Sequence, residues 1–266
     1  MKRWVTSLVA IPVLILVIGP APRWIFQIFA YLAAIFALFE FLKMTVPQIK
    51  MKYRLTAILF AALFYYFIAY GLLFLLLPTL PIAASVLLCL YLFGDSTDRR
   101  HASQEIGAVL LGLLYIVAPI ALILFIDKYP NGNIWIFFLL ATIILSDTGA
   151  FYGGRWFGRH KLYPAVSPGK TWEGAFGGLL LSLLAPLFFF FVFPAIFPLQ
   201  KALFILALLL SAAGQIGDLS ESMLKRSSGI KDSGSLLPGH GGMLDRVDGL
   251  LFAIPILYLY IRWSIP

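Results

Sequence analysis

Long apolar stretches, each close to the length of a bilayer-spanning helix, constrain this chain more than any other feature. The hydrocarbon core of a bilayer needs about 20 consecutive apolar residues per helix. Such stretches recur along the 266 residues, of which 61% are hydrophobic and only 12% charged. About a quarter of the residues in a soluble domain are charged. The sequence therefore predicts an all-α integral membrane protein and excludes an ordinary soluble fold.

Nine spanning helices are predicted from these stretches and from the turn residues between them. The third and fourth have a second interpretation, in which residues 55–77 form one span and the prolines at 78 and 81 break the chain. The first stretch resembles a signal peptide, but no small-residue cleavage site follows it. We expect it to be retained, and cleavage remains the alternative. The expected spans are 4–19, 24–42, 54–70, 72–93, 107–126, 133–148, 174–194, 202–218 and 249–263.

The basic residues predict how these helices are oriented. With the N-terminus in the cytoplasm, the opposite side holds only four of the twenty lysines and arginines, namely Arg23, Lys128, Lys201 and Arg262. Such a bias is typical of cytoplasmic loops. It accounts for the net charge of +8 without a nucleic-acid partner. We therefore expect a multi-pass protein of the inner, cytoplasmic membrane, with its N-terminus inside and its C-terminus outside.

Polar residues divide this single membrane-embedded unit into regions. Four spans fill residues 1–98, middle helices fill 99–145, and residues 146–266 contain two long segments rich in glycine, serine and charge. These segments, 147–174 and 218–248, both fall on the predicted cytoplasmic side. Long polar connections carry function more often than short ones. The catalytic region is therefore predicted at 146–266. The single Cys89 lies in an apolar run, which excludes a disulfide framework.

Acidic residues flank the second long segment at both ends. If the helix at 202–218 continues, then Asp218, Glu221, Ser222 and Lys225 share one face. Asp245 and Asp248 share a face at the start of the last span. Carboxylates at a membrane surface, interleaved with basic residues, favour a hard cation that bridges phosphates. A solvated helix with internal ion pairs, and helix capping by one aspartate, are the simpler alternatives.

Between these acids lies a glycine-rich stretch that contains Lys231 and His240. Glycines let backbone N–H groups approach an anion closely, and the two side chains add donors. A flexible connector is the alternative interpretation.

The first long segment begins at Asp147, which closes an apolar span. An ionisable residue at that depth indicates function, whereas Gly149 and Gly153 nearby equally fit close helix packing. Lys170 and Thr171 are predicted phosphate donors at a helix start. Pro164 stands where a P-loop would need glycine, which excludes that nucleotide-binding motif.

The second long segment contains an ordered series of mainly polar residues and glycines, namely Ser222, Lys225-Arg226, Lys231-Asp232, His240-Gly241-Gly242, Asp245-Arg246, Val247 and Asp248. This series resembles the signature of the phosphatidate cytidylyltransferases, also called CDP-diacylglycerol synthases. Residues 146–150 and 167–171 are similar to segments of the same family, so the resemblance covers about 146–249.

This resemblance implies a nucleotidyltransferase that converts CTP and phosphatidic acid to CDP-diacylglycerol and pyrophosphate. It also implies a requirement for Mg²⁺, a second cation nearby, and a homodimer in the lipid bilayer. We predict that Asp218 and Asp245 hold Mg²⁺, and that Asp248 and Asp147 serve a second cation or surround the first. Asp218, Lys225, Asp245 and Asp248 are the predicted catalytic residues. Lys225 is also predicted to bind a substrate phosphate. The other residues predicted to bind substrate are Arg226, Lys231, His240, Arg246, Lys170, Thr171 and Ser222.

Two other classes of protein remain as alternatives. A CDP-alcohol phosphotransferase also uses aspartates at a membrane surface, but apolar residues follow Asp248-Gly249 where its pattern would continue. A transporter would place polar groups near the bilayer midplane. The gathering of polar groups at one predicted surface favours an enzyme that acts on a lipid headgroup.

Overall fold

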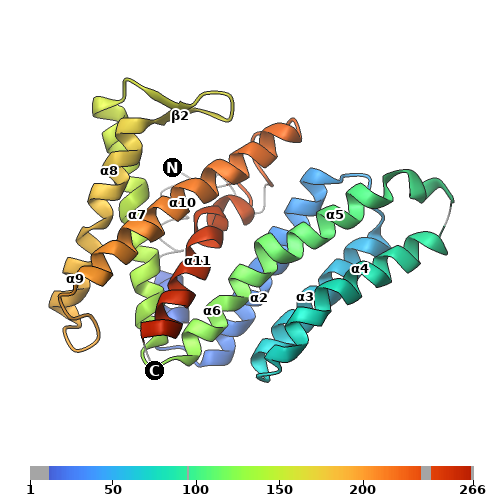
Figure 1. Cartoon of the computed structure of the whole chain (residues 1–266), viewed down its shortest axis with the longest axis horizontal. Helices are drawn as coiled ribbons and strands as arrows, with labels where there is room; N and C mark the ends of the chain where they lie inside the picture. The colour runs from blue at the N-terminus through green and yellow to red at the C-terminus, as the bar shows by residue number, and fades with distance from the viewer. Residues whose placement is uncertain (1–11, 95, 235–240, 265–266) are drawn as a thin grey trace. The chain divides into compact units, whose positions relative to one another are not determined.

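The computed structural model describes residues 12–94, 96–234 and 241–264, and these are predominantly helical (Figure 1). Residues 12–18 are helical, whereas the first part of the expected span 4–19 lies outside the described residues. The labelled helices are α2 (Arg23–Thr45), α3 (Met51–Ala69), α4 (Leu76–Leu92), α5 (Ala102–Gly112), α6 (Ala118–Lys128), α7 (Gly132–Phe157), α8 (Trp172–Ser182), α9 (Leu184–Val192), α10 (Lys201–Ser227) and α11 (Leu244–Ser264). Short helical turns occupy η1 (Leu73–Leu75), η2 (Ser96–His101) and η3 (Leu113–Val117).

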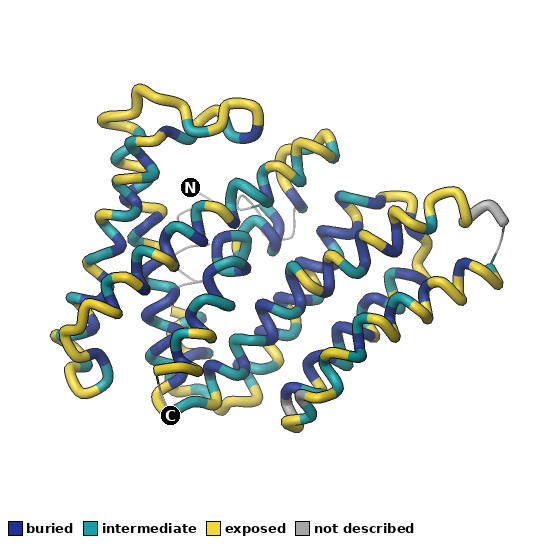
Figure 2. The backbone as a smooth tube through the Cα atoms, viewed as in Figure 1, coloured by how far each residue is buried: buried dark blue, intermediate teal, exposed yellow. Residues whose placement is uncertain are grey.

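Six helical segments in the described residues are long and apolar enough to cross a membrane. Exposed residues recur along these helices (Figure 2). They include large apolar ones, such as Leu180 at 69% and Phe191 at 77%. Exposed apolar surface of this extent is expected where lipid covers a protein. The chain is therefore a multi-pass membrane protein, and the exact number of nine spans stays a prediction. The six segments are Arg23–Thr45, Met51–Ile68, Arg99–Lys128, Gly132–Phe157, Trp172–Val192 and Lys201–Ser227.

The third and fourth predicted spans are separate helices. Helix α3 ends at Ala69, and the turn η1 leads into α4 at Leu76. Pro81 lies inside α4 instead of marking its start. The alternative with one span over residues 55–77 is therefore wrong.

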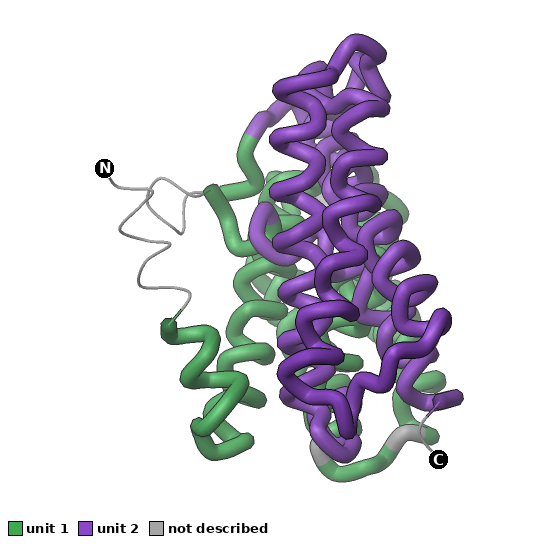
Figure 3. Tube along the Cα trace, turned by 90° about the vertical axis from the view of Figure 1, so that its left-hand side faces the viewer, with its two compact units in different colours: residues 1–125, 232–244 green, residues 126–231, 245–266 purple. Residues whose placement is uncertain are grey.

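The chain divides into two compact units (Figure 3). The first unit contains residues 1–125 and 232–244, and the second contains 126–231 and 245–266. These limits differ from the sequence-based regions that ended at residues 98 and 145. In the first unit the rings of Tyr53 and Tyr91 stack with centroids 3.9 Å apart. The Tyr91 hydroxyl donates a hydrogen bond to the buried carboxylate of Glu105.

In the second unit, α7 continues well past its expected end at residue 148. It reaches Phe157 because its glycines pack against α8, and a Cβ atom at Gly149 would overlap the backbone of Gly177. Asp147 is therefore inside a helix and does not close it, which corrects the prediction that a loop begins there. The close packing predicted for Gly149 and Gly153 is confirmed.

A short antiparallel hairpin joins α7 to α8. Its strands are β1 (Lys161–Tyr163) and β2 (Ser167–Thr171), with Lys161 opposite Thr171. The sequence predicted an all-α fold. The hairpin was missed because strands this short leave little alternation of apolar and polar residues in the sequence. The hairpin places Lys170 and Thr171 directly before α8, at the helix start where they were predicted.

Candidate active site

The polar end of α10 contains one face of functional side chains. Because the helix runs to Ser227, the positions 218, 221, 222 and 225 are all helical, as predicted. The Ser222 hydroxyl donates to Asp218 Oδ1 at 3.5 Å, and the Lys225 ammonium pairs with the Glu221 carboxylate. Glu221 is fully buried.

Helix α11 brings the second pair of acids to α10. It begins at Leu244, so that Asp245 and Asp248 occupy its first turns. A Cβ atom at Gly217 would lie 2.5 Å from the Asp248 carbonyl oxygen and 3.2 Å from the Gly249 Cα atom. Only glycine at position 217 therefore permits this approach of the two helices. The contact sets Asp248 beside Asp218.

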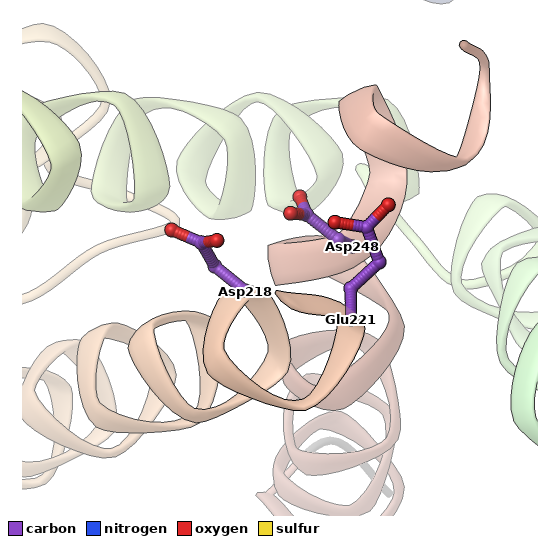
Figure 4. A group of neighbouring side chains, drawn as sticks. All are labelled: Asp218, Glu221 and Asp248. Atoms are coloured by element: carbon purple, nitrogen blue, oxygen red, sulfur yellow. The ribbon is translucent and has the colours of Figure 1, made fainter. Parts of the chain in front are cut away.

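Three carboxylates converge at this crossing (Figure 4). Asp218 and Glu221 extend from α10 and Asp248 from α11, and one oxygen of each lies within 4.8 Å of the others. Asp245 and Asp147 belong to the same place, because they line a cavity of about 110 Å³ together with Asp218 and Asp248. The structure thus brings together all four acids predicted to serve cations, and it adds Glu221.

Lysines lie against these carboxylates. Lys170 Nζ is 2.7 Å from Asp218 Oδ2, and Lys225 Nζ is 2.7 Å from Asp245 Oδ1 while it also contacts Glu221. Burial raises the pKa of the Asp248 carboxyl to about 7, and the nearby charge of Asp218 adds to the rise. The acids are therefore crowded and only partly compensated by the two lysines.

A divalent cation fits this donor set. Hard cations such as Mg²⁺ prefer carboxylate oxygens and keep several waters, for which the small cavity has room. Among the described residues, no hydrogen-bond donor reaches the buried Glu221 Oε1 atom. A positive charge there would relieve the repulsion between Asp218, Glu221 and Asp248.

A larger cavity of about 550 Å³ shares Asp147 and Asp218 with the small one. Arg155, Lys170 and Thr171 line it, which gives it cationic and hydroxyl groups. Thr171 Oγ1 accepts a hydrogen bond from the Gly174 amide at 3.1 Å and so caps α8. The volume lies within the range of about 300–1,000 Å³ found for small-molecule sites.

The other residues predicted to bind substrate have weaker links to the two cavities. Arg226 donates to the backbone carbonyls of Val166 and Ile230, both at 3.3 Å. Lys231 and Arg246 are exposed, and Arg246 also lines the small cavity. His240 lies outside the described residues.

Some residues of the site were missed by sequence reasoning. Glu221 was placed on the correct helix face but left out of the metal set, although its i+3 spacing from Asp218 signalled it. Arg155 received no role, because its cavity depends on the extension of α7. Outside the site, His160 pairs with Glu173, with His160 Nδ1 and Glu173 Oε1 2.6 Å apart.

Comparison with known proteins places this chain in a family. The sequence model of the cytidylyltransferase family matches residues 1–264. The phosphatidate cytidylyltransferase of Bacillus subtilis is 35% identical over 92% of this chain and 90% of its own length. Those of Staphylococcus epidermidis and Staphylococcus saprophyticus are each 41% identical over 60% of this chain, and the matches span 61% and 58% of these relatives. The chain belongs to the cytidylyltransferase family.

Proposed function

We propose that the chain is a phosphatidate cytidylyltransferase, which joins CTP and phosphatidate to give CDP-diacylglycerol and pyrophosphate. The observation that carries this proposal is the convergence of Asp218, Glu221 and Asp248 beside a basic cavity. The family and the names of the relatives support the choice of substrates.

Charge is the main obstacle in this reaction, because two polyanions must meet. An oxygen of the lipid phosphate attacks the α-phosphorus of CTP in line, and pyrophosphate leaves. The attacking phosphate monoester is mostly dianionic near neutrality, so that no strong general base is required. Catalysis by positioning and charge neutralisation then suffices.

The residues of the site fit these two tasks. Asp218, Glu221 and Asp248 would hold Mg²⁺, with Asp245 and Asp147 beside them. When bound there, Mg²⁺ would neutralise phosphate oxygens and help to orient them. Lys170 and Arg155 offer positive charge to a phosphate in the larger cavity, and the Thr171 hydroxyl can donate to it. Lys225 holds Asp245 and Glu221 in place.

Several features of the proposal rest on the sequence alone. The active site is assigned to the cytoplasmic face of the inner membrane, because the basic residues gather on that side of the predicted topology. A second cation and a homodimer remain predictions from the family resemblance.

The proposal is tested with purified protein in lipid nanodiscs, labelled CTP, phosphatidate and Mg²⁺. We expect label in the lipid fraction and one pyrophosphate released for each lipid product. Asp218→Asn and Asp248→Asn should each lower turnover by roughly 100-fold or more, since metal contacts supply several kcal/mol. Absence of lipid-linked CMP from the wild-type protein would contradict the proposed activity.

A further inference from the structure

A buried acid of the first unit, Glu40, binds the segment that leads into α11. Glu40 lies near the end of α2 and is only 7% exposed. Its Oε2 atom accepts a hydrogen bond from the Leu244 amide at 2.9 Å and another from the Ser233 hydroxyl at 3.3 Å. Glu40, Ser233 and Leu244 all belong to this unit.

The contact with Leu244 is a helix cap supplied from a distant part of the chain. The first amides of a helix have no partner within it, and the N-terminal end carries partial positive charge. Leu244 is the first residue of α11, so that a carboxylate on its amide satisfies one of these donors. Side chains that cap a helix usually come from its own N-terminal residues. Here the cap comes from α2, 204 residues earlier.

Two glycines allow the backbone of segment 232–244 to approach this carboxylate closely. A Cβ atom at either Gly234 or Gly242 would overlap the Glu40 carboxylate. The one at Gly242 would also overlap the Ser233 hydroxyl. Segment 232–244 therefore packs closely on Glu40 at both of its described ends.

The consequence concerns the acids at the start of α11. Asp245 is bonded directly to Leu244, and Asp248 follows one turn later on the same helix. The geometry points to Glu40 as a positioning residue for Asp245 and Asp248. By holding the Leu244 amide, Glu40 fixes the residue at which their helix begins. The effect of this role on catalysis rests on the proposed function. A displacement of about 1 Å in a catalytic group can lower the rate roughly 100-fold.

Glu105 provides a matched control. It is a buried acid of the same unit, 5% exposed, and its carboxylate accepts from the Tyr91 hydroxyl. Replacement of Glu105 removes a buried carboxylate whose hydrogen-bond partner, Tyr91, lies on α4. A general loss of packing should therefore appear in both series of variants, whereas a loss of positioning should appear only at Glu40.

The first experiment measures amide hydrogen exchange in nanodiscs, and it does not depend on activity. Glu40→Leu should raise the exchange of the Leu244 amide about tenfold or more, because its acceptor is gone. Glu40→Gln should keep the protection, since its amide oxygen still accepts. Gly242→Ala should raise exchange although Glu40 is intact. Unchanged exchange in Glu40→Leu, or an equal rise in Glu105→Leu, would overturn the inference.

The second experiment measures turnover against Mg²⁺ concentration. Glu40→Leu should lower kcat about 100-fold and raise the half-saturating Mg²⁺ concentration, and Glu40→Gln should restore most of both. Glu105→Leu should leave the Mg²⁺ requirement unchanged. A Glu40→Leu enzyme with the wild-type Mg²⁺ requirement would contradict the positioning role. If the wild-type protein makes no lipid product, the proposed function fails and the exchange experiment still decides the inference.

Discussion

Two lysines pair with three acids of the site: Lys225 with Glu221 and Asp245, and Lys170 with Asp218. Lys225 is the most buried of the cationic partners, with 12% of its side chain exposed between Glu221 and Asp245. Lys170 is more open at 26%, and its partner Asp218 is exposed to 43%. A buried ion pair is costly to break because the remaining charge is left uncompensated, whereas an exposed pair contributes little.

Replacement of Lys225 should therefore affect stability more than replacement of Lys170. Lys225→Met is expected to cost about 3–5 kcal/mol in the absence of divalent cations. Added Mg²⁺ should recover part of that loss, because it compensates the same carboxylates. Lys170→Met should unfold near the wild-type temperature and lower turnover instead. Thermal unfolding in detergent, with and without Mg²⁺, checks this, and equal losses in the two variants would contradict it.

The raised pKa of Asp248 makes cation binding depend on pH. The folded carboxyl, with a pKa of about 7 against an ordinary value of 3.8, keeps a proton that the unfolded chain has already released. The metal-free protein should therefore lose stability as pH rises from about 4 to about 7. Mg²⁺ must displace that proton, so its affinity should rise with pH through this range, by up to about tenfold per pH unit.

Titration calorimetry and thermal unfolding at about pH 6 and about pH 8 measure both effects. In Asp248→Asn the dependence of metal-free stability on pH should become weaker. A Mg²⁺ affinity that is the same at both pH values would speak against a protonated Asp248.

At the scale of elements, Gly217 makes the tightest glycine contact between α10 and α11. Alanine normally stabilises a helix interior by about 1 kcal/mol relative to glycine. Gly217→Ala should nevertheless lower stability and Mg²⁺ affinity, because its Cβ atom would meet the Asp248 carbonyl. Gly107 on α5 is the matched control, since a Cβ atom there would meet nothing within 4 Å.

Thermal unfolding and Mg²⁺ titration of the two alanine variants test this prediction. Gly107→Ala should be as stable as the wild type or more stable, and fully active. A Gly217→Ala protein with wild-type stability and Mg²⁺ affinity would contradict the prediction, because the close approach of α10 and α11 would then not be required.

The sequence predicts local features of these elements better than their contacts. The face shared by Asp218, Glu221, Ser222 and Lys225 follows from helical spacing, and the structure confirms it. The extension of α7 to Phe157 and the hairpin before α8 depend on glycine contacts between distant segments, which spacing does not reveal. Glu40 was overlooked inside an apolar span, although an acid in such a place already indicates function. Its partners lie about 200 residues away, so no local pattern identifies them.

For the whole molecule, the orientation in the membrane is the main prediction from sequence. Helix α10 has 27 residues and so is about 40 Å long, enough to cross the hydrocarbon core of about 30 Å. Its acidic end should face the cytoplasm and its start at Lys201 the opposite side. The exposed positions Lys201 and Ser227 mark the two ends.

Cysteine labelling tests this orientation in a Cys89→Ser background, which removes the single native cysteine. In spheroplasts, a membrane-impermeant maleimide should label Lys201→Cys and spare Ser227→Cys. In inverted vesicles the pattern should reverse. Labelling of Ser227→Cys from the outside would place the candidate site on the wrong face for cytoplasmic CTP.

The central claim is that Asp218, Glu221 and Asp248 form a cation site, and direct measurement of ion binding tests it without assuming any reaction. Paramagnetic Mn²⁺, used in place of Mg²⁺, can be titrated into the protein in nanodiscs and followed by electron paramagnetic resonance. We expect saturable binding that is lost in both Asp218→Asn and Asp248→Asn and kept in Asp127→Asn, which lies at the end of α6. Wild-type binding in the Asp218 and Asp248 variants would contradict the account.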